Sequence, residues 1–413
     1  MKKPAPASGP LSGLKVIELS HIMAGPACGV MLADMGADVI KVEKVPGGDD
    51  TRRFMPPKIG EESAAFLMMN RNKRGIAVDL KSEDGKAVLR RLLKDADVVT
   101  ENYRRGVMEE MGLGCETLRR ENPRLVYCSI SGFGRTGPYA ERAGFDLVAQ
   151  GMSGLMSITG EGPGRPPVKV GAPVTDITAG ILGAMGILAA LHHRARTGEG
   201  QMVDTSLFEA GIVQTYWQSA IALATGVAPG PMGSAHPLNA PYEAFETKDG
   251  WITVGAANQA NWLRLVDMLG VKQLADDAKF ATNADRIRNR VGLAEKLAPH
   301  FRARSSKEWL EALEQAKIPA GPVLDVKEMH ADAQTIARDM VAETEHSRLG
   351  RVKTIGHPVK FSATPTNLRR GAPLYGEHTR EILREHGFSD GEIERMARAG
   401  AIVVAEEKAA AAE

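Results

Sequence analysis

One aspartate stands where a carboxylate could take part in chemistry. Asp176 follows an extended, proline-containing stretch at residues 168–175. It precedes an apolar run at 177–191, which predicts a helix starting at or just after Asp176. The dipole and free N–H groups of a helix N-terminus stabilise an ionised carboxylate. The helix then carries three glycines at a spacing of three, which would let a backbone or a ligand approach closely: Gly180, Gly183 and Gly186. Two interpretations stay open, an N-cap aspartate of a buried helix and a carboxylate that meets a ligand.

Basic residues gather near the ends of the early predicted strands. Ligands of open α/β sheets bind outside the carboxyl ends of the strands. Guanidinium and ammonium groups at that place could bind a polyanion such as a phosphorylated nucleotide. Any single one of them could also be a solvated surface residue. The set comprises Lys44, Arg52, Arg53, Arg71, Lys73, Arg74, Lys81, Arg104 and Arg105.

Several catalytic motifs are missing from the sequence. The loop after the first predicted strand, residues 20–26, has one glycine, so the GxGxxG fingerprint of dinucleotide binding is absent. The glycine-rich residues 160–164 lack the GK[ST] of a P-loop, and neither HExxH nor GxSxG occurs. The 3 cysteines are too few and too scattered for a disulfide framework or a zinc site, so no metal is expected.

The elements that must position these residues alternate between strand and helix over the first 130 residues. Such alternation predicts a parallel α/β sheet with crossover helices. Ser82 is the expected N-cap of one helix, with acidic residues in its first turn. The expected strands are residues 14–19, 38–43, 75–80, 97–101 and 125–130, and the expected helices are 25–35 and 82–96.

The second half of the chain has a different pattern. A helical region with a strand-like break at 201–205 covers residues 177–225, and the Pro- and Gly-rich residues 228–241 indicate a domain boundary. After about residue 345 the chain is expected to be poor in strands, and the Ala/Glu-rich tail at 401–413 is expected to fray. A hairpin is expected at 242–256, and helices at 258–269, 291–301 and 306–316.

Composition limits the class of protein. The chain has 413 residues, with 52 Lys+Arg against 51 Asp+Glu. At roughly 150 residues per domain, this length predicts two or three domains. The near-zero charge argues against a nucleic-acid partner. The N-terminal ten residues lack the apolar region of a signal peptide, and the longest apolar run is shorter than the roughly 20 residues of a membrane span. The expectation is a cytoplasmic enzyme with no membrane partner.

Eight stretches in order carry a resemblance to known proteins. They are LSGLKVIELSHIMAGP (11–26), GADVIKVEKVPGGDDTR (36–52), NRNKRGIAVDLK (70–81), ENYRRGVMEEMGL (101–113), NPRLVYCSISGFGRTGPYAERAGFD (122–146), TGEGQMVDTSLFEA (197–210), IPAGPV (318–323) and APLYGEHT (372–379). With them the chain resembles the class III CoA-transferases, or CaiB/BaiF family, from Leu11 to about Ile402. This family includes formyl-CoA transferase and carnitine CoA-transferase, with α-methylacyl-CoA racemase as a neighbouring branch.

The resemblance implies a fold and an oligomer. The expected α/β chain has a large Rossmann-like CoA-binding domain at residues 1–228, completed by 340–413, and a smaller α+β domain at 229–339. Two such ring-like chains would interlock as a homodimer. Coenzyme A and acyl-CoA enter as substrates together with a small organic acid, and no cofactor is permanently bound.

The resemblance also implies the site. The catalytic aspartate of the family falls on Asp176, which favours the ligand interpretation of that carboxylate. The CoA-contact positions fall on Ile22, Met23, Ala24, Lys44, Val78, Asp79, Leu80, Lys81, Asn102, Tyr103, Arg104, Arg142, Ala143 and Asp146.

Two departures narrow the implied activity. Phe145 stands where the racemase branch has a histidine, and phenylalanine cannot transfer a proton. Met23 stands where the oxalate-specific enzymes have a glutamine, and the glycine run of those enzymes is missing. The pattern favours the succinyl-CoA-dependent branch acting on dicarboxylic acids, with an acyl-CoA racemase or epimerase as the alternative. Candidate contacts for the carboxylate of the acceptor acid are Arg52 and Arg71, and candidates for polar contacts near the acyl group are His21 and His236.

Overall fold

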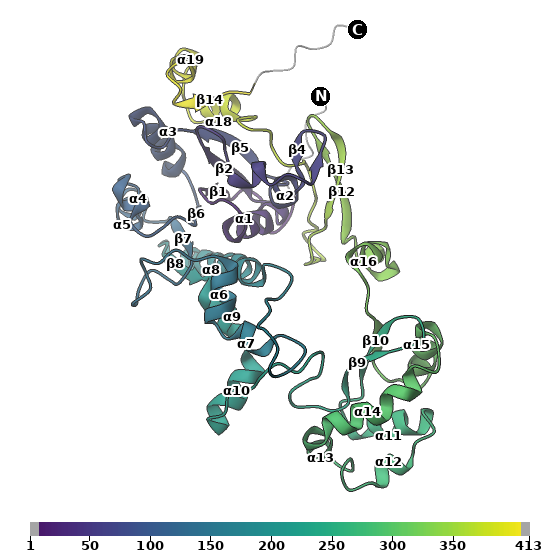
Figure 1. The fold of residues 1–413 in the computed structure, drawn as a ribbon. Coiled ribbons are helices and arrows are strands. Elements are labelled where there is room, and N and C mark those ends of the chain that lie inside the picture. Colours follow the sequence, from purple (N-terminus) through teal and green to yellow (C-terminus); the bar gives the residue numbers. More distant parts are fainter. Residues whose placement is uncertain (1–7, 406–413) are drawn as a thin grey trace, which may run out of the picture. The chain divides into compact units, whose positions relative to one another are not determined.

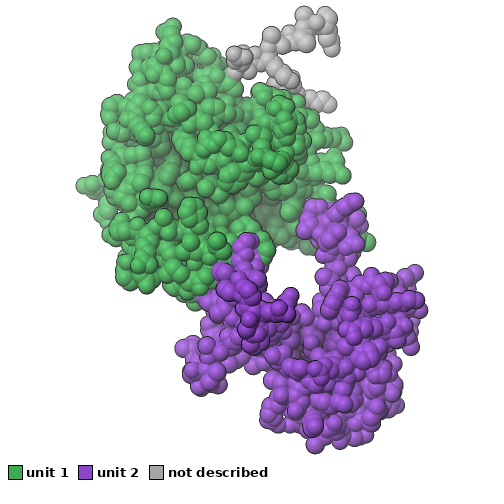
Figure 2. Space-filling view, in the orientation of Figure 1, with its two compact units in different colours: residues 1–153, 171–214, 333–413 green, residues 154–170, 215–332 purple. Residues whose placement is uncertain are grey.

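The computed structural model describes residues 8–405. These residues form two compact units, which Figure 2 colours separately. Unit 1 comprises residues 8–153, 171–214 and 333–405, and unit 2 comprises 154–170 and 215–332. Residues on both sides of unit 2 in the sequence therefore build unit 1. The division into domains that the family resemblance implies stays a prediction.

A seven-stranded sheet forms the centre of unit 1 (Figure 1). Its order is β14-β5-β2-β1-β6-β7-β8, and every neighbouring pair is parallel except β14 with β5. The predicted parallel α/β sheet is confirmed. Its strands are β1 (Lys15–Glu18), β2 (Asp38–Lys44), β5 (Arg74–Val78), β6 (Val98–Glu101), β7 (Val126–Ser131), β8 (Met202–Ser206) and β14 (Ile402–Val403).

Alternate strand residues feed two hydrophobic cores, because successive side chains of a strand point to opposite faces. On β1, Ile17 joins one core and Val16 the other. The Ile17 core is covered by α3 (Glu83–Lys94), α5 (Cys115–Glu121), α18 (Thr379–Glu385) and α19 (Asp390–Arg398). The Val16 core is covered by α1 (Ala24–Asp34), α8 (Val174–Thr197) and α9 (Leu207–Val213). As predicted, Ser82 caps α3, with its side chain accepting a hydrogen bond from Gly85 N.

Helices α1 and α8 pack closely because glycines line the contact. A Cβ on Gly180 would lie 2.6 Å from Ala24 O, and one on Gly183 would lie 3.4 Å from Cys28 Sγ of α1 and 2.9 Å from Ile130 Cδ1 of β7. The glycine row therefore admits the backbone of α1. The sequence alone left open whether a backbone or a ligand approaches these glycines.

Helix α8 is the one helix in the described residues that is long and apolar enough to cross a membrane, judged by length and composition alone. Of its most apolar window, 39% is buried inside the protein. Core helices that pack on a sheet share these properties. The expected cytoplasmic location stays a prediction.

The C-terminal part of unit 1 corrects one expectation. A hairpin of β12 (Val341–His346) and β13 (Gly350–Ile355) occupies the region expected to be poor in strands. Of the tail expected to fray, residues 402–403 form β14, and 406–413 lie outside the described residues.

Unit 1 also contains η1 (Asp50–Arg53), β3 (Lys58–Ile59), β4 (Glu62–Ser63), α2 (Ala64–Met69), α4 (Val107–Glu110), α6 (Asp146–Met152) and α17 (Ala333–Ala337).

Unit 2 has its own core around a three-stranded antiparallel sheet. The predicted hairpin is confirmed as β9 (Tyr242–Glu246) and β10 (Trp251–Gly255), and β11 (Ala320–Pro322) pairs with β10. The helices of unit 2 are α7 (Leu155–Ile158), α10 (Tyr216–Thr225), α11 (Gln259–Met268), α12 (Gln273–Asp276), α13 (Asn283–Arg288), α14 (Arg290–Phe301), α15 (Ser306–Gln315) and α16 (Val326–Ala331).

Candidate active site

The predicted CoA-contact residues follow five neighbouring strands of the parallel sheet. Residues 22–24 follow β1, Lys44 ends β2, and 78–81, 102–104 and 142–146 follow β5, β6 and β7. Parallel strands end at one edge, so all five segments lie at the carboxyl edge of the sheet. From β1 the chain builds toward β2 on one side and toward β6 on the other. The segments after β1 and β6 therefore flank the switch point, where open α/β sheets bind ligands.

The loops after β1 and β6 are joined by one side chain. The Asn102 amide donates to His21 O at 2.8 Å and accepts from His21 N at 2.9 Å. Next to this pair, Ile22 adopts a positive φ of 68°, which is rare for a β-branched residue. Burial lowers the pKa of His21, so its ring is neutral near pH 7. Asn102 thus shapes the loop at the switch point.

Asp176 lies in the first turn of α8, two residues after the start of the helix at Val174. The N-cap is Pro173, so the expectation that the helix starts at or after Asp176 is wrong by one turn or less. Asp176 and Gly180 are one turn apart on the same face of the helix. Gly180 packs on Ala24, so this face of α8 is turned toward the start of α1. Asp176 therefore lies on the side of α8 next to the loop after β1.

Asp146, at the start of α6, fastens the residue before Asp176. Its Oδ1 accepts from Thr175 N at 3.0 Å and from Thr175 Oγ1 at 2.7 Å, and its Oδ2 accepts from Gln150 Nε2 at 2.7 Å. The predicted CoA-contact residue Asp146 is therefore engaged by the protein itself. The loop that carries it folds back tightly, because a Cβ on Gly144 would lie 2.4 Å from Gly132 Cα.

The carboxyl group of Asp176 has a raised pKa. Burial, with a contribution from the Asp146 charge, raises its pKa to about 7. The described residues donate no hydrogen bond to this carboxylate, which leaves both oxygens available to a substrate. Perturbed carboxyl groups of this kind mark functional sites.

The basic residues divide into two groups. Lys81, Arg104 and Arg142 are exposed, and Lys44 is exposed beside Asp50 at 2.8 Å. The Arg142 guanidinium lies 4.1 Å from the centre of the Tyr139 ring. These four cations can meet phosphate groups.

Arg52 and Arg71 serve the scaffold. Arg52 forms two hydrogen bonds of 2.7 Å with Glu43 at the end of β2. Buried Arg71 precedes β5, at the opposite edge of the sheet, and pairs with Asp34 at the end of α1 at 2.7 Å. Both candidate contacts for an acid are thus engaged. His236 belongs to unit 2, where its Nδ1 accepts from Leu238 N at 3.0 Å.

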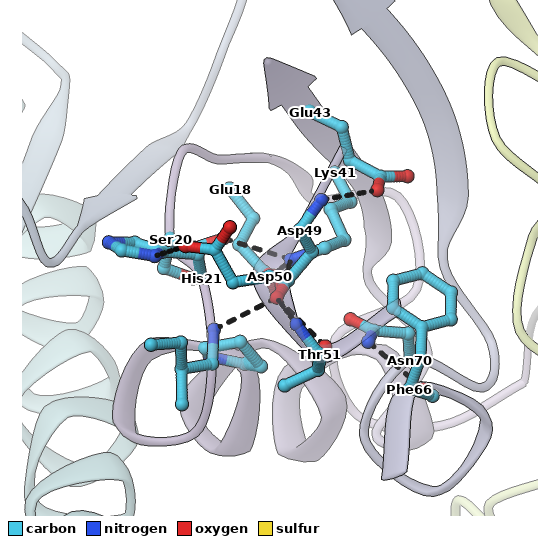
Figure 3. A network of polar contacts seen from close by, with 12 residues as sticks. Glu18, Ser20, His21, Lys41, Glu43, Asp49, Asp50, Thr51, Phe66 and Asn70 are labelled. Carbon is cyan, nitrogen blue, oxygen red and sulfur yellow. Dashed lines mark hydrogen bonds and ion pairs between the residues drawn. The ribbon is translucent and has the colours of Figure 1, made fainter. Parts of the chain in front are cut away.

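Sequence reasoning missed a buried charge network below the loop after β1. Figure 3 shows Glu18 and Lys41 with Asp49, which in turn meets Thr51. The signal was a charged residue in the middle of the apolar strand DVIKVEK. Within residues 8–405, no group of three or more His, Cys, Asp or Glu side chains could bind a metal ion.

Comparison with known proteins assigns the chain to a class. Residues 11–379 match CoA-transferase family III, and the chain belongs to this family of transferase enzymes. A succinate–glutarate CoA-transferase of Agrobacterium fabrum is 44% identical over 91% of this chain and 95% of its own. A succinyl-CoA:mesaconate CoA-transferase of Haloarcula marismortui is 40% identical over 93% of this chain and 98% of its own.

A solved structure supports the same assignment. A CaiB/BaiF family protein from Brucella suis is 41% identical, with a TM-score of 0.81 over 92% of this chain and 100% of its own. The expected family and its mixed α/β fold with a parallel central sheet are thereby confirmed.

Proposed function

We propose that the chain transfers CoA from succinyl-CoA to a dicarboxylic acid through covalent intermediates at Asp176. The observation that carries the proposal is the half-buried carboxylate of Asp176, with its raised pKa, on the end of α8 beside the Ala24 loop. The names of the two relatives support succinyl-CoA as donor and glutarate or mesaconate as the type of acceptor.

The reaction begins at the thioester of the donor. The Asp176 carboxylate attacks the acyl carbonyl and expels CoA thiolate, which leaves an aspartyl–acyl anhydride. The thiolate then attacks the aspartyl carbonyl of this anhydride, which releases succinate and forms an aspartyl–CoA thioester. The acceptor carboxylate attacks that thioester and again expels the thiolate. In the last step the thiolate attacks the acceptor acyl carbonyl, which gives the new acyl-CoA and restores the Asp176 carboxylate.

The chain's own groups support these steps. Because the anhydride is hydrolysed easily, burial of Asp176 protects it from water. In the first turn of α8, Val174 N and Thr175 N already donate to Ala172 O and to Asp146, which leaves the N–H of Asp176 available to an oxyanion. The exposed cations of the carboxyl edge would bind the phosphates of CoA: Lys44, Lys81, Arg104 and Arg142.

The remaining contacts of CoA would come from the loops of the same edge. Asn102 and Asp146 contribute mainly by shaping these loops, since their polar groups already bond the protein. The resemblance assigns these contacts to Ile22, Met23, Ala24, Val78, Asp79, Leu80, Asn102, Tyr103, Ala143 and Asp146. The Val78 side chain is buried in the core of unit 1, so it would support the loop after β5 from below.

The racemase alternative requires a second acid–base group next to Asp176. Phe145 occupies the corresponding position and is 65% exposed, with no ionisable atom. The transferase therefore remains the better proposal.

A homodimer also belongs to the proposal. The face of α8 turned away from the sheet exposes Ile181, Met185 and Leu188, at the spacing of one helix face. Helix α6 exposes Leu147 and Met152. An apolar patch of this kind marks an interface, and a second copy of the chain is the occupant that the family implies. Met185→Glu should yield monomers in light scattering, whereas Val291→Glu in unit 2 should not. A monomeric wild-type protein would exclude the dimer.

Product analysis tests the transfer. Purified protein is incubated with succinyl-CoA and a panel of acids that includes glutarate, mesaconate, itaconate, citramalate, malate, oxalate and carnitine, and new CoA esters are identified by mass spectrometry. We expect esters of dicarboxylates with wild type and none with Asp176→Ala, while Asp84→Ala at the surface retains activity. Esters that persist in Asp176→Ala would remove this residue as the nucleophile.

A further inference from the structure

Four charged side chains are enclosed below the loop that follows β1. Lys41 Nζ lies 3.1 Å from Glu18 Oε1 and 2.9 Å from Asp49 Oδ2. Lys73 Nζ lies 2.8 Å from Glu18 Oε2. All four are buried, and their two positive and two negative charges balance. Because desolvation offsets the attraction in a buried ion pair, such a network contributes little net stability. Its value therefore lies in the geometry that it fixes.

Asp49 is the member of this network that reaches the loop. Its Oδ1 accepts from Ile22 N at 3.2 Å. The same oxygen accepts from Thr51 N at 2.9 Å and from Thr51 Oγ1 at 2.8 Å, while Oδ2 pairs with Lys41 (Figure 3). The Lys41 ammonium and the two Thr51 donors outweigh burial and hold the pKa of Asp49 well below its usual range. The carboxylate thus stays ionised and acts as a fixed acceptor for the backbone of Ile22.

The backbone of Ile22 needs such an acceptor. Its φ of 68° places a β-branched residue in the left-handed region, where L-residues other than glycine are disfavoured. Asn102 fixes the preceding residue, His21, through both backbone polar groups. Asp49 then sets the direction in which the chain leaves His21 and enters α1 at Ala24. A strained conformation persists only where its surroundings over-determine it.

We infer that Asp49 is a positioning residue for CoA binding, which acts by holding Ile22 in the conformation that the CoA-contacting residues 22–24 require. The inference rests on the proposed function for the identity of the ligand. Asp49 itself lies under the loop and touches no ligand, since it is buried and its oxygens are engaged by Ile22, Thr51 and Lys41.

Asp49→Asn tests this role. An amide keeps the size of the side chain but turns an NH₂ group toward the Lys41 ammonium or toward Ile22 N, so one contact is lost. We expect the dissociation constant of free CoA, measured by calorimetry, to rise about tenfold. The KM for acyl-CoA should rise by the same factor, with kcat and the KM for the acid changed less than threefold. Thr51→Val, which removes one donor to Asp49, is a milder variant with an expected threefold effect.

A matched control separates positioning from general loss of structure. Asp34 is a buried, ion-paired aspartate at the other end of α1, where it meets Arg71. Asp34→Asn should lower the melting temperature at least as much as Asp49→Asn and leave CoA binding unchanged. If the two variants weaken CoA binding equally, the role assigned to Asp49 is wrong.

A double-mutant cycle tests the route through Ile22. Glycine adopts a positive φ without strain, so an Ile22→Gly background should need the Asp49 anchor less. We expect Asp49→Asn to weaken CoA binding about threefold or less in that background, against about tenfold in the wild-type background. Equal effects in both backgrounds would overturn the inference.

The binding measurement keeps this inference distinct from the proposed reaction. A wild-type protein that binds CoA but forms no new ester contradicts the transfer reaction and leaves the Asp49 cycle interpretable. A wild-type protein that binds no CoA contradicts both.

Discussion

The Asp146 carboxylate accepts two hydrogen bonds from Thr175, at 3.0 Å from its backbone nitrogen and at 2.7 Å from its hydroxyl. Thr175 immediately precedes Asp176, so one carboxylate fixes the backbone on which the other is mounted. The same proximity makes Asp146 a source of negative charge that raises the pKa of Asp176, after burial. Asp146 thus influences both the geometry and the protonation of the proposed nucleophile.

The pH dependence of the reaction should report Asp176. Attack requires the ionised carboxylate, and the pKa of Asp176 is raised to about 7. We therefore expect kcat/KM for the acyl-CoA to increase as pH rises through about 7 and to level off above it. Initial rates between pH 5.5 and 8.5 would measure this limb. A profile that is flat down to pH 5.5 would contradict the raised pKa.

Asp146→Asn should shift that limb. Removing the negative charge favours ionisation of Asp176, so its pKa falls while the larger effect of burial remains. The limb of the kcat/KM profile moves to lower pH. Asp84→Asn, which breaks a surface ion pair with Arg395, should leave the profile in place. A shift to higher pH would contradict the assigned cause.

Asp176→Asn should stabilise the fold at alkaline pH. The pKa of this carboxyl is 3.8 without perturbation and about 7 in the protein. The folded state therefore binds its proton more tightly, and wild-type stability falls as pH rises from about 4 to 7. Because the side chain is half-buried, we expect a gain of about 1–2 kcal/mol at pH 8, diminishing toward pH 4. Thermal unfolding at both pH values measures it, and a loss of stability at pH 8 would refute it.

Gly180→Ala should loosen the contact between α8 and α1. The new methyl group would lie 2.6 Å from Ala24 O and 2.7 Å from Ala27 Cβ, so one helix must move. We expect a loss of about 1–3 kcal/mol in the free energy of unfolding, together with weaker CoA binding. Gly292→Ala in α14 meets nothing within 4 Å and should be neutral or slightly stabilising. Equal stability of the two variants in denaturant titrations would contradict this packing role.

Strands and helices of unit 1 were predictable because short stretches of sequence carry their patterns. Val- and Ile-rich runs mark β1, β2 and β5, Ser82 marks the start of α3, and the strand ends place the loops of residues 22–24 and 102–104 at one edge. Local pattern made Asp176 a candidate, and only the family resemblance favoured a catalytic role over an N-cap.

The parts that could not be predicted depend on contacts between distant residues. Lys41 lies 23 residues from Glu18, and the strand DVIKVEK shows a charged residue among apolar ones without showing which side chains pair with it. Arg52 and Arg71 were candidate ligands by charge alone, until Glu43 and Asp34 were found beside them. Strand β12 (VAETEH) carries polar residues on both of its faces. The sequence therefore lacks the apolar–polar alternation that would have predicted its pairing with β13.

The pairing of β14 with β5 has a consequence for synthesis of the chain on the ribosome. Residues 402–403 cover the edge of β5, yet they are translated after all the other strands of that sheet. The long segment of unit 2, residues 215–332, is complete before them and carries its own core. Unit 2 can therefore fold while the sheet of unit 1 still has an open edge, and that edge is a site for association with other nascent chains until β14 has been translated.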